Sequence, residues 1–180
     1  LIPAYLLEKG HDKADKLRKD IYRFEQQSDE LDQQITQYLT RIAENDLTRS
    51  NSKRITNMYK MTSDFERIAD HCIEMENVIW EKNKAKAWFS QQMRDDLFSI
   101  FNLLEIAMIT LNELISKDFQ PESMNKAKVC EDQINQLKEQ LIHSNKQRFD
   151  TGETNFEQAA YFNELIYHCG RINQHVMNIN

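Results

Sequence analysis

The chain has 180 residues and a net charge of −6, which argues against a nucleic-acid-binding protein because such proteins need a basic surface. It contains only 3 Gly and 2 Pro, too few for the tight turns that connect the strands of a β-sheet. The 40% hydrophobic and 29% charged residues suit long amphipathic helices. Three cysteines without a Cys-x-x-Cys pair indicate reduced thiols. The composition therefore predicts an all-α protein in a reducing compartment.

The first long helix is predicted from Asp12 to Asn45, with Asp12 as its N-cap. Its apolar positions alternate in steps of three and four, as in a heptad repeat. These positions are Ala14, Leu17, Ile21, Phe24, Leu31, Ile35, Tyr38 and Ile42. Only Ser28 is clearly polar within this stripe. The spacing predicts a seam that is buried against another helix.

A polar break at 48–52 contains serines that can cap a second helix, which is predicted to reach about Trp80. Glu76 interrupts the apolar stripe of this helix. After a basic connector, Ser90 is predicted to cap a third helix over 91–116. This third helix is the most apolar of all, so we expect it at the centre of the bundle.

Residues 117–120 predict a turn, and Pro121 suits the first position of a fourth helix that ends near Phe149. Thr154 and Glu157 have the spacing of a capping box, which predicts the start of a fifth helix. This last helix continues nearly to the end of the chain. No segment has the roughly 18 to 20 uncharged residues in succession that are typical of a membrane span.

An internal repeat links the two halves of the chain. Residues 66–71 (Glu-Arg-Ile-Ala-Asp-His) align with residues 170–175 (Gly-Arg-Ile-Asn-Gln-His). His71 and His175 occupy matching positions, which favours a shared structural role such as a hydrogen bond between helices. The repeat indicates two helical hairpins of the same design.

The run Phe-Glu-Arg-Ile-Ala-Asp-His at 65–71 resembles the signature of the PhoU family. Glu25 and Asp29 resemble the companion motif that the family carries on a paired helix. The resemblance implies an elongated all-α bundle of two PhoU-like three-helix repeats, residues 1–86 and 87–180. The first repeat is expected to be truncated at its N-terminus, because only a short apolar segment precedes its long helices.

Two pairs of carboxylates have a spacing of four, which places Glu25 beside Asp29 and Glu66 beside Asp70 on one helix face. Like charges arranged in this way destabilise a helix unless a cation lies between them. In an antiparallel hairpin the two pairs would face each other, and hard cations accept such oxygen ligands. The alternative is that all four side chains face water, with basic neighbours as loose partners.

In the PhoU family these motifs bind clusters of metal ions. The resemblance therefore implies a metal site at Glu25, Asp29, Glu66 and Asp70, for ions of the iron, zinc or manganese class. The second repeat keeps only Glu131 of the four acidic positions, so an equivalent second cluster is not expected.

No catalytic motif is visible: there is no nucleophile elbow, no glycine-rich phosphate loop and no pair of Glu-x-x-His motifs. We therefore expect no enzyme and no catalytic residues. The resemblance implies a regulatory domain in phosphate transport or homeostasis, most like the soluble C-terminal PhoU domain of a sodium/phosphate cotransporter-like protein. The alternative is a ligand-free helical scaffold for dimerisation or docking, with the heptad stripe as its seam.

The chain begins at Leu1 without a methionine, so we expect a cytoplasmic domain that a missing N-terminal region tethers to the inner face of a membrane. The expected partner is the membrane transporter portion of the same or another protein, with a homodimer as a further option. We expect no nucleic-acid partner and no membrane insertion of this segment itself.

Overall fold

The structure is a computed structural model that describes residues 1–116 and 121–179. In these ranges every regular element is a helix and no strand occurs, which confirms the all-α prediction. The helices are α1 (Ile2–Leu7), α2 (His11–Ala43), α3 (Arg49–Lys84), α4 (Gln91–Ser116), α5 (Pro121–Asp150) and α6 (Phe156–Ile179). The turn predicted at 117–120 lies outside the described residues.

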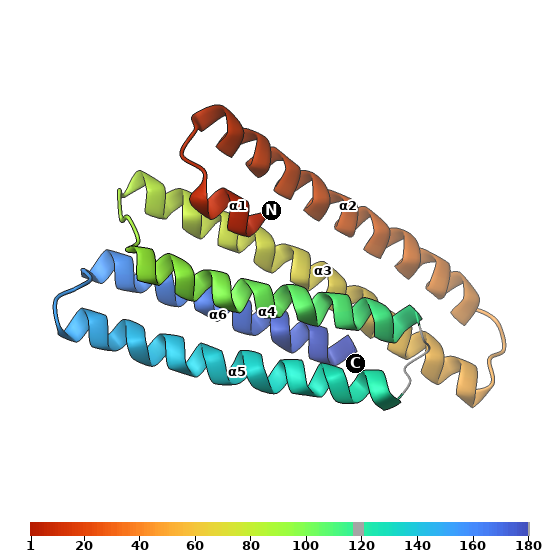
Figure 1. The fold of residues 1–180 in the computed structure, drawn as a ribbon. Helices are drawn as coiled ribbons and strands as arrows, with labels where there is room; N and C mark the ends of the chain where they lie inside the picture. Colours follow the sequence, from red (N-terminus) through yellow and green to blue (C-terminus); the bar gives the residue numbers. More distant parts are fainter. Residues whose placement is uncertain (117–120, 180) are drawn as a thin grey trace.

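The long helices run side by side in an elongated bundle (Figure 1). Helix α6 packs against α3, α4 and α5, whereas α2 packs against α3 and the short α1. The contact between α3 and α6 therefore joins the first hairpin to the second half of the chain. Large apolar side chains from both halves form one continuous core, with Phe162 and Leu165 of α6 fully buried in it.

The prediction that the third helix lies at the centre is wrong, because α6 holds that place. One face of α4 is buried, including Met93 and Leu97, but Ile106 and Ile109 on its other face are about half exposed. Within the described residues, α4 is the one helix long and apolar enough to cross a membrane. A third of its most apolar 18-residue window is buried in the bundle, and a core helix of a soluble protein passes the same test of length and composition.

Two predicted helix starts are displaced. Helix α2 begins at His11 with Gly10 as its N-cap, so Asp12 lies inside the first turn. The carboxylate of Glu8 accepts hydrogen bonds from the backbone N–H groups of Lys9 (3.0 Å) and Gly10 (2.8 Å). These bonds hold the backbone just before the helix, and Gly10 has no side chain with which to cap it.

The capping box of α6 is shifted by one residue from its predicted place. The side chain of Asn155 accepts a hydrogen bond from the backbone N–H of Gln158 (2.8 Å), and the side chain of Gln158 accepts one from the backbone N–H of Asn155 (3.0 Å). Thr154 and Glu157 have the same spacing, and a sequence pattern does not separate the two registers. The predicted cap at Ser90 is confirmed by its hydroxyl, which accepts a hydrogen bond from the backbone N–H of Met93.

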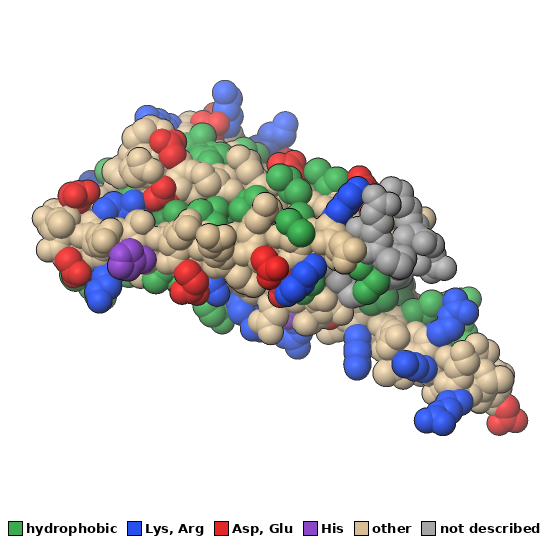
Figure 2. All heavy atoms as spheres, turned by 60° about the horizontal axis from the view of Figure 1, so that its bottom comes forward, with side chains coloured by type: hydrophobic (Ala, Val, Ile, Leu, Met, Phe, Trp, Pro, Cys, Tyr) green, Lys and Arg blue, Asp and Glu red, His purple; other side chains and the backbone are tan. Residues whose placement is uncertain are grey.

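The heptad stripe of α2 is only partly buried. Ile21 and Leu39 are core residues, but Phe24 and Leu31 are 53% and 56% exposed. The short α1 lies over one end of the α2–α3 hairpin, whereas α4 lies along α5 and α6 (Figure 1). The far end of the α2–α3 hairpin projects beyond the rest of the molecule and carries several Lys and Arg side chains (Figure 2). An apolar groove therefore stays open along this hairpin, lined in part by Phe24, Leu31, Ile35, Met58 and Phe65.

Candidate metal centre

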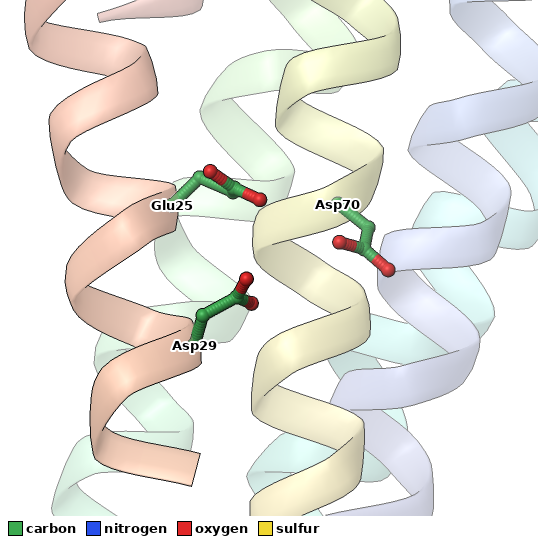
Figure 3. Close-up of side chains that lie close together, drawn as sticks. All are labelled: Glu25, Asp29 and Asp70. Atoms are coloured by element: carbon green, nitrogen blue, oxygen red, sulfur yellow. The ribbon is translucent and has the colours of Figure 1, made fainter. Parts of the chain in front are cut away.

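The antiparallel pairing of α2 and α3 brings the predicted carboxylates together. Glu25 and Asp29 extend from α2, and Asp70 extends from α3 (Figure 3). The three side chains lie at about the same level of the hairpin. Glu25 and Asp29 point toward α3, whereas the Asp70 side chain points away from α2, toward the side of α3 that faces α6. Farther along the hairpin, a hydrogen bond of 2.8 Å between the hydroxyls of Thr40 and Tyr59 links the same helices.

Three of the four predicted ligands form one compact group. One carboxylate oxygen from each of Glu25, Asp29 and Asp70 lies within 4.8 Å of the other two. Each of these side chains is half-buried. Glu66 lies outside this group of three, although the charge of Asp70 contributes to its raised pKa. The tertiary structure thus brings together three of the four predicted residues, and Glu66 feels the charge of Asp70 from outside the group.

The electrostatics of the cluster are those of uncompensated negative charge. Burial, followed by the charges of Asp29 and Asp70, raises the pKa of Glu25. Burial, followed by the charge of Asp70 and the hydrogen bond to it, also raises the pKa of Glu66, and Arg67 opposes this shift only in part. A raised carboxylate pKa means that the ionised form of the group is disfavoured in the cluster. A bound cation would stabilise the ionised carboxylates.

The donor set consists of carboxylate oxygens. Such ligands suit hard cations, which accept carboxylates together with water molecules. Zinc more often selects nitrogen and sulfur ligands, so the donor set fits manganese or iron better than zinc. An ion bound between Glu25 or Asp29 and Asp70 would link α2 to α3.

The matching place in the second repeat does not form an acidic cluster among the described residues. Glu131 pairs with Lys128 at 2.7 Å, an i,i+3 contact at the surface of α5. Asn135, which replaces an acidic residue of the motif, lies 3.5 Å from Asn173. Neutral amides and a paired glutamate carry no excess charge that a metal ion would have to neutralise.

A histidine cluster next to Asp70 was only partly foreseen from the sequence. The Nδ1 atoms of His71 and His168 lie 3.1 Å apart, and Nδ1 of His175 lies 2.7 Å from a carboxylate oxygen of Asp64. The predicted hydrogen bonds between helices are confirmed for His71 and His175. The repeat alignment offered no signal for His168, because it matches this residue with Asp64 and not with a second histidine.

Protonation of His71 and His168 is disfavoured. Burial, followed by the nearby His168 and His175, lowers the pKa of His71 to about 4, and burial also lowers the pKa of His168. At pH 7 His71 is therefore neutral, so its contact with His168 joins α3 to α6 without adding charge beside the carboxylates.

One comparison with known proteins finds a match to part of the chain. The family model of the PhoU domain matches residues 6–79. No curated protein and no solved structure matches the chain. The PhoU family is linked to the regulation of phosphate homeostasis and is regulatory rather than enzymatic. A PhoU domain is therefore detected at residues 6–79, the segment that carries the three clustered carboxylates and Glu66.

Proposed function

We propose that this chain is a non-catalytic regulatory domain in phosphate transport or homeostasis and that its α2–α3 hairpin binds metal. The observation that carries the proposal is the convergence of Glu25, Asp29 and Asp70 within 4.8 Å in the segment that matches the PhoU domain. Bound metal would replace the repulsion among these carboxylates by attraction and would fix α2 against α3.

The proposed setting is the cytoplasmic side of a membrane, where the domain would act on a sodium/phosphate cotransporter-like protein. The partner would be the transporter portion of the same or another polypeptide, which this domain contacts through its helices. Phosphate transport by the full-length protein should therefore change when this segment is deleted. Identical transport with and without the segment would refute the regulatory role.

Metal content is the direct test of the site. Elemental mass spectrometry of the purified chain should detect iron, manganese or zinc, before or after reloading with these ions. The double variant Asp29→Ala/Asp70→Ala should lose the metal. The matched control is Glu30→Ala/Glu74→Ala, because these are exposed carboxylates on the same two helices, and it should bind as much metal as the parent. Equal metal content in the two double variants, or none in the parent after reloading, would refute the metal site.

A second candidate function, a helical docking or dimerisation scaffold, is favoured by the open groove of the α2–α3 hairpin. Phe24, Leu31 and Ile35 expose much of their apolar surface there instead of packing in the core. A metal-free dimer whose mass is unchanged by the variant Asp29→Ala/Asp70→Ala would support the scaffold over the metal-regulated domain. Sedimentation velocity at several protein concentrations measures this mass.

A further inference from the structure

A lysine is buried at the end of α3. The side chain of Lys82 has 3% of its surface exposed, and the residue lies in the last turn of the helix. Lysine is almost never buried to this extent without a partner of opposite charge. Among the described residues, no carboxylate lies within ion-pair distance of Lys82, in contrast to the buried Glu76, which pairs with Arg18 at 2.8 Å.

The contacts that Lys82 does make are neutral. Its ammonium group donates one hydrogen bond, of 2.7 Å, to the side-chain oxygen of Asn83. It also lies 5.2 Å from the ring centre of Trp88 and 5.0 Å from that of Phe89. Aromatic faces and the C-terminal end of a helix attract a cation. An ammonium group has three donors, so these contacts leave it with unused hydrogen-bonding capacity.

A second cation lies beside the first. Arg94, in the first turn of α4, donates to the backbone carbonyl of Phe89 and to the side-chain oxygen of Gln91. Both acceptors are neutral, and no carboxylate of the described residues pairs with Arg94. Burial, followed by the charge of Arg94, lowers the pKa of Lys82 to about 8. At pH 7 two cations therefore share one site, and neither of them pairs with a carboxylate of the described residues.

The two cations line a cavity of about 270 Å³ between the end of α1, the end of α3 and the start of α4. Lys9 contributes a third positive charge to the lining, and Glu8 contributes the one negative charge. The carboxylate of Glu8 is already engaged by the backbone N–H groups of Lys9 and Gly10. The cavity thus has a net positive lining with donors that are free to bind a ligand.

We propose that this cavity, whose lining includes Lys82 and Arg94, binds a small oxyanion of the phosphate class. Lysine and arginine are the usual side chains for such anions, and hydrogen bonds between ionised partners are stronger than neutral ones. The cavity is smaller than the roughly 300 to 1,000 Å³ that is typical of sites for larger organic ligands. Inorganic phosphate therefore fits the site better than a nucleotide does.

The binding of an oxyanion stands on the geometry of this cavity and not on the metal cluster of α2 and α3. Only the idea that phosphate bound in this cavity serves as a regulatory signal rests on the proposed function. The site nevertheless lies where a signal would reach both halves of the chain, because its lining comes from α1 and α3 of the first half and from α4 of the second.

The test is isothermal titration calorimetry with inorganic phosphate at pH 7 and constant ionic strength, with chloride as the balancing anion. The protein carries Asp29→Ala/Asp70→Ala as a background, so that metal at the carboxylate cluster contributes nothing to phosphate binding. In this background Lys82→Met should weaken phosphate binding at least tenfold. Lys84→Met is the matched control, because Lys84 is exposed on the same helix, and it should leave the affinity unchanged.

Stability provides an independent readout. Lys82→Met removes a buried charge and keeps an apolar stem, so its melting temperature in chloride should equal or exceed that of the parent. Phosphate should raise the melting temperature of the parent but not that of Lys82→Met. Arg94→Gln should also weaken phosphate binding. If Lys82→Met does not fold, the phosphate affinity of Arg94→Gln tests the proposal in its place.

Absence of phosphate binding by the parent, or equal affinity in the parent and Lys82→Met, would overturn the proposal. Tighter binding of adenosine monophosphate than of inorganic phosphate would overturn the assignment to a small ion. None of these outcomes bears on the metal content of the carboxylate cluster, so the proposed function and this inference fail independently.

Discussion

The substitution Asp29→Asn should stabilise the metal-free protein while it weakens metal binding. Asn has the shape of Asp but no charge, so the variant removes the repulsion that Asp29 exerts on Glu25 and Asp70. At the 4.8 Å limit between these oxygens, Coulomb's law gives about 0.9 kcal/mol per pair in water and about 3.5 kcal/mol at an effective dielectric constant of 20. The three side chains are half-buried, which favours the lower part of this range.

We therefore expect the free energy of unfolding of the metal-free variant to rise by about 1 to 2 kcal/mol. For a chain of this size that change raises the melting temperature by roughly 2 to 8 °C. The measurement is thermal unfolding followed by circular dichroism, after chelation and gel filtration, in a buffer of low ionic strength. Addition of 1 M NaCl should remove most of the difference, because salt screens the repulsion between partly exposed charges.

Added metal should reverse this stability difference, so that the parent becomes more stable than Asp29→Asn. The parent should gain stability from a cation that binds only its folded state, whereas Asp29→Asn lacks one proposed ligand and should gain less. Glu30→Gln is the control, since Glu30 is an exposed carboxylate on the same helix. A metal-free Asp29→Asn variant that is less stable than the parent at low salt would refute the reasoning, because repulsion would then not dominate at this site.

Three further substitutions test other parts of the structure. His71 has a folded-state pKa of about 4, below the value of about 6.5 in unfolded chains, so the stability that it contributes is present above pH 6.5 and is lost as the pH falls towards 4. Urea unfolding of His71→Gln should show a flatter decline over this range, and an unchanged slope would contradict the assignment. Arg18→Met leaves the carboxylate of Glu76, which is 0% exposed, without its partner and should cost about 3 to 5 kcal/mol in urea unfolding. The double variant Arg18→Met/Glu76→Met should recover most of that loss; if it is as unstable as the single variant, the pair is not the cause. Asn155→Ala removes the cap of α6 and should lower the free energy of unfolding by about 0.5 to 2 kcal/mol, whereas a change at Thr154 should leave the capping hydrogen bonds intact.

Glu25 and Glu66 should show the opposite dependence on pH. Their raised pKa values mean that the metal-free folded state holds these protons more tightly than the unfolded state does. Their contribution to stability is therefore present at acidic pH and declines as the pH rises through their folded-state pKa values. Asp29→Asn should weaken this dependence for Glu25, because it removes one of the charges that raise its pKa.

Local patterns in the sequence determined the helices and the pairing of the carboxylates. The third helix spans residues 91–116 as predicted, because its apolar spacing and the Ser90 cap are both local signals. The carboxylate cluster could also be predicted from the sequence. A spacing of four places two carboxylates on one face of each helix, and an antiparallel hairpin brings those faces close together.

Only the tertiary structure decided which apolar faces are covered and which charges are buried. Phe24 and Leu31 follow the same heptad pattern as Ile21, yet only Ile21 lies where other helices cover it. The sequence predicts that Lys82 belongs to a basic connector. In the structure Lys82 lines a cavity together with Arg94, which follows 12 residues later in the chain. Helix periodicity specifies which residues share a face. Burial and charge pairing depend on which distant segment packs against that face, and a local pattern does not contain this information.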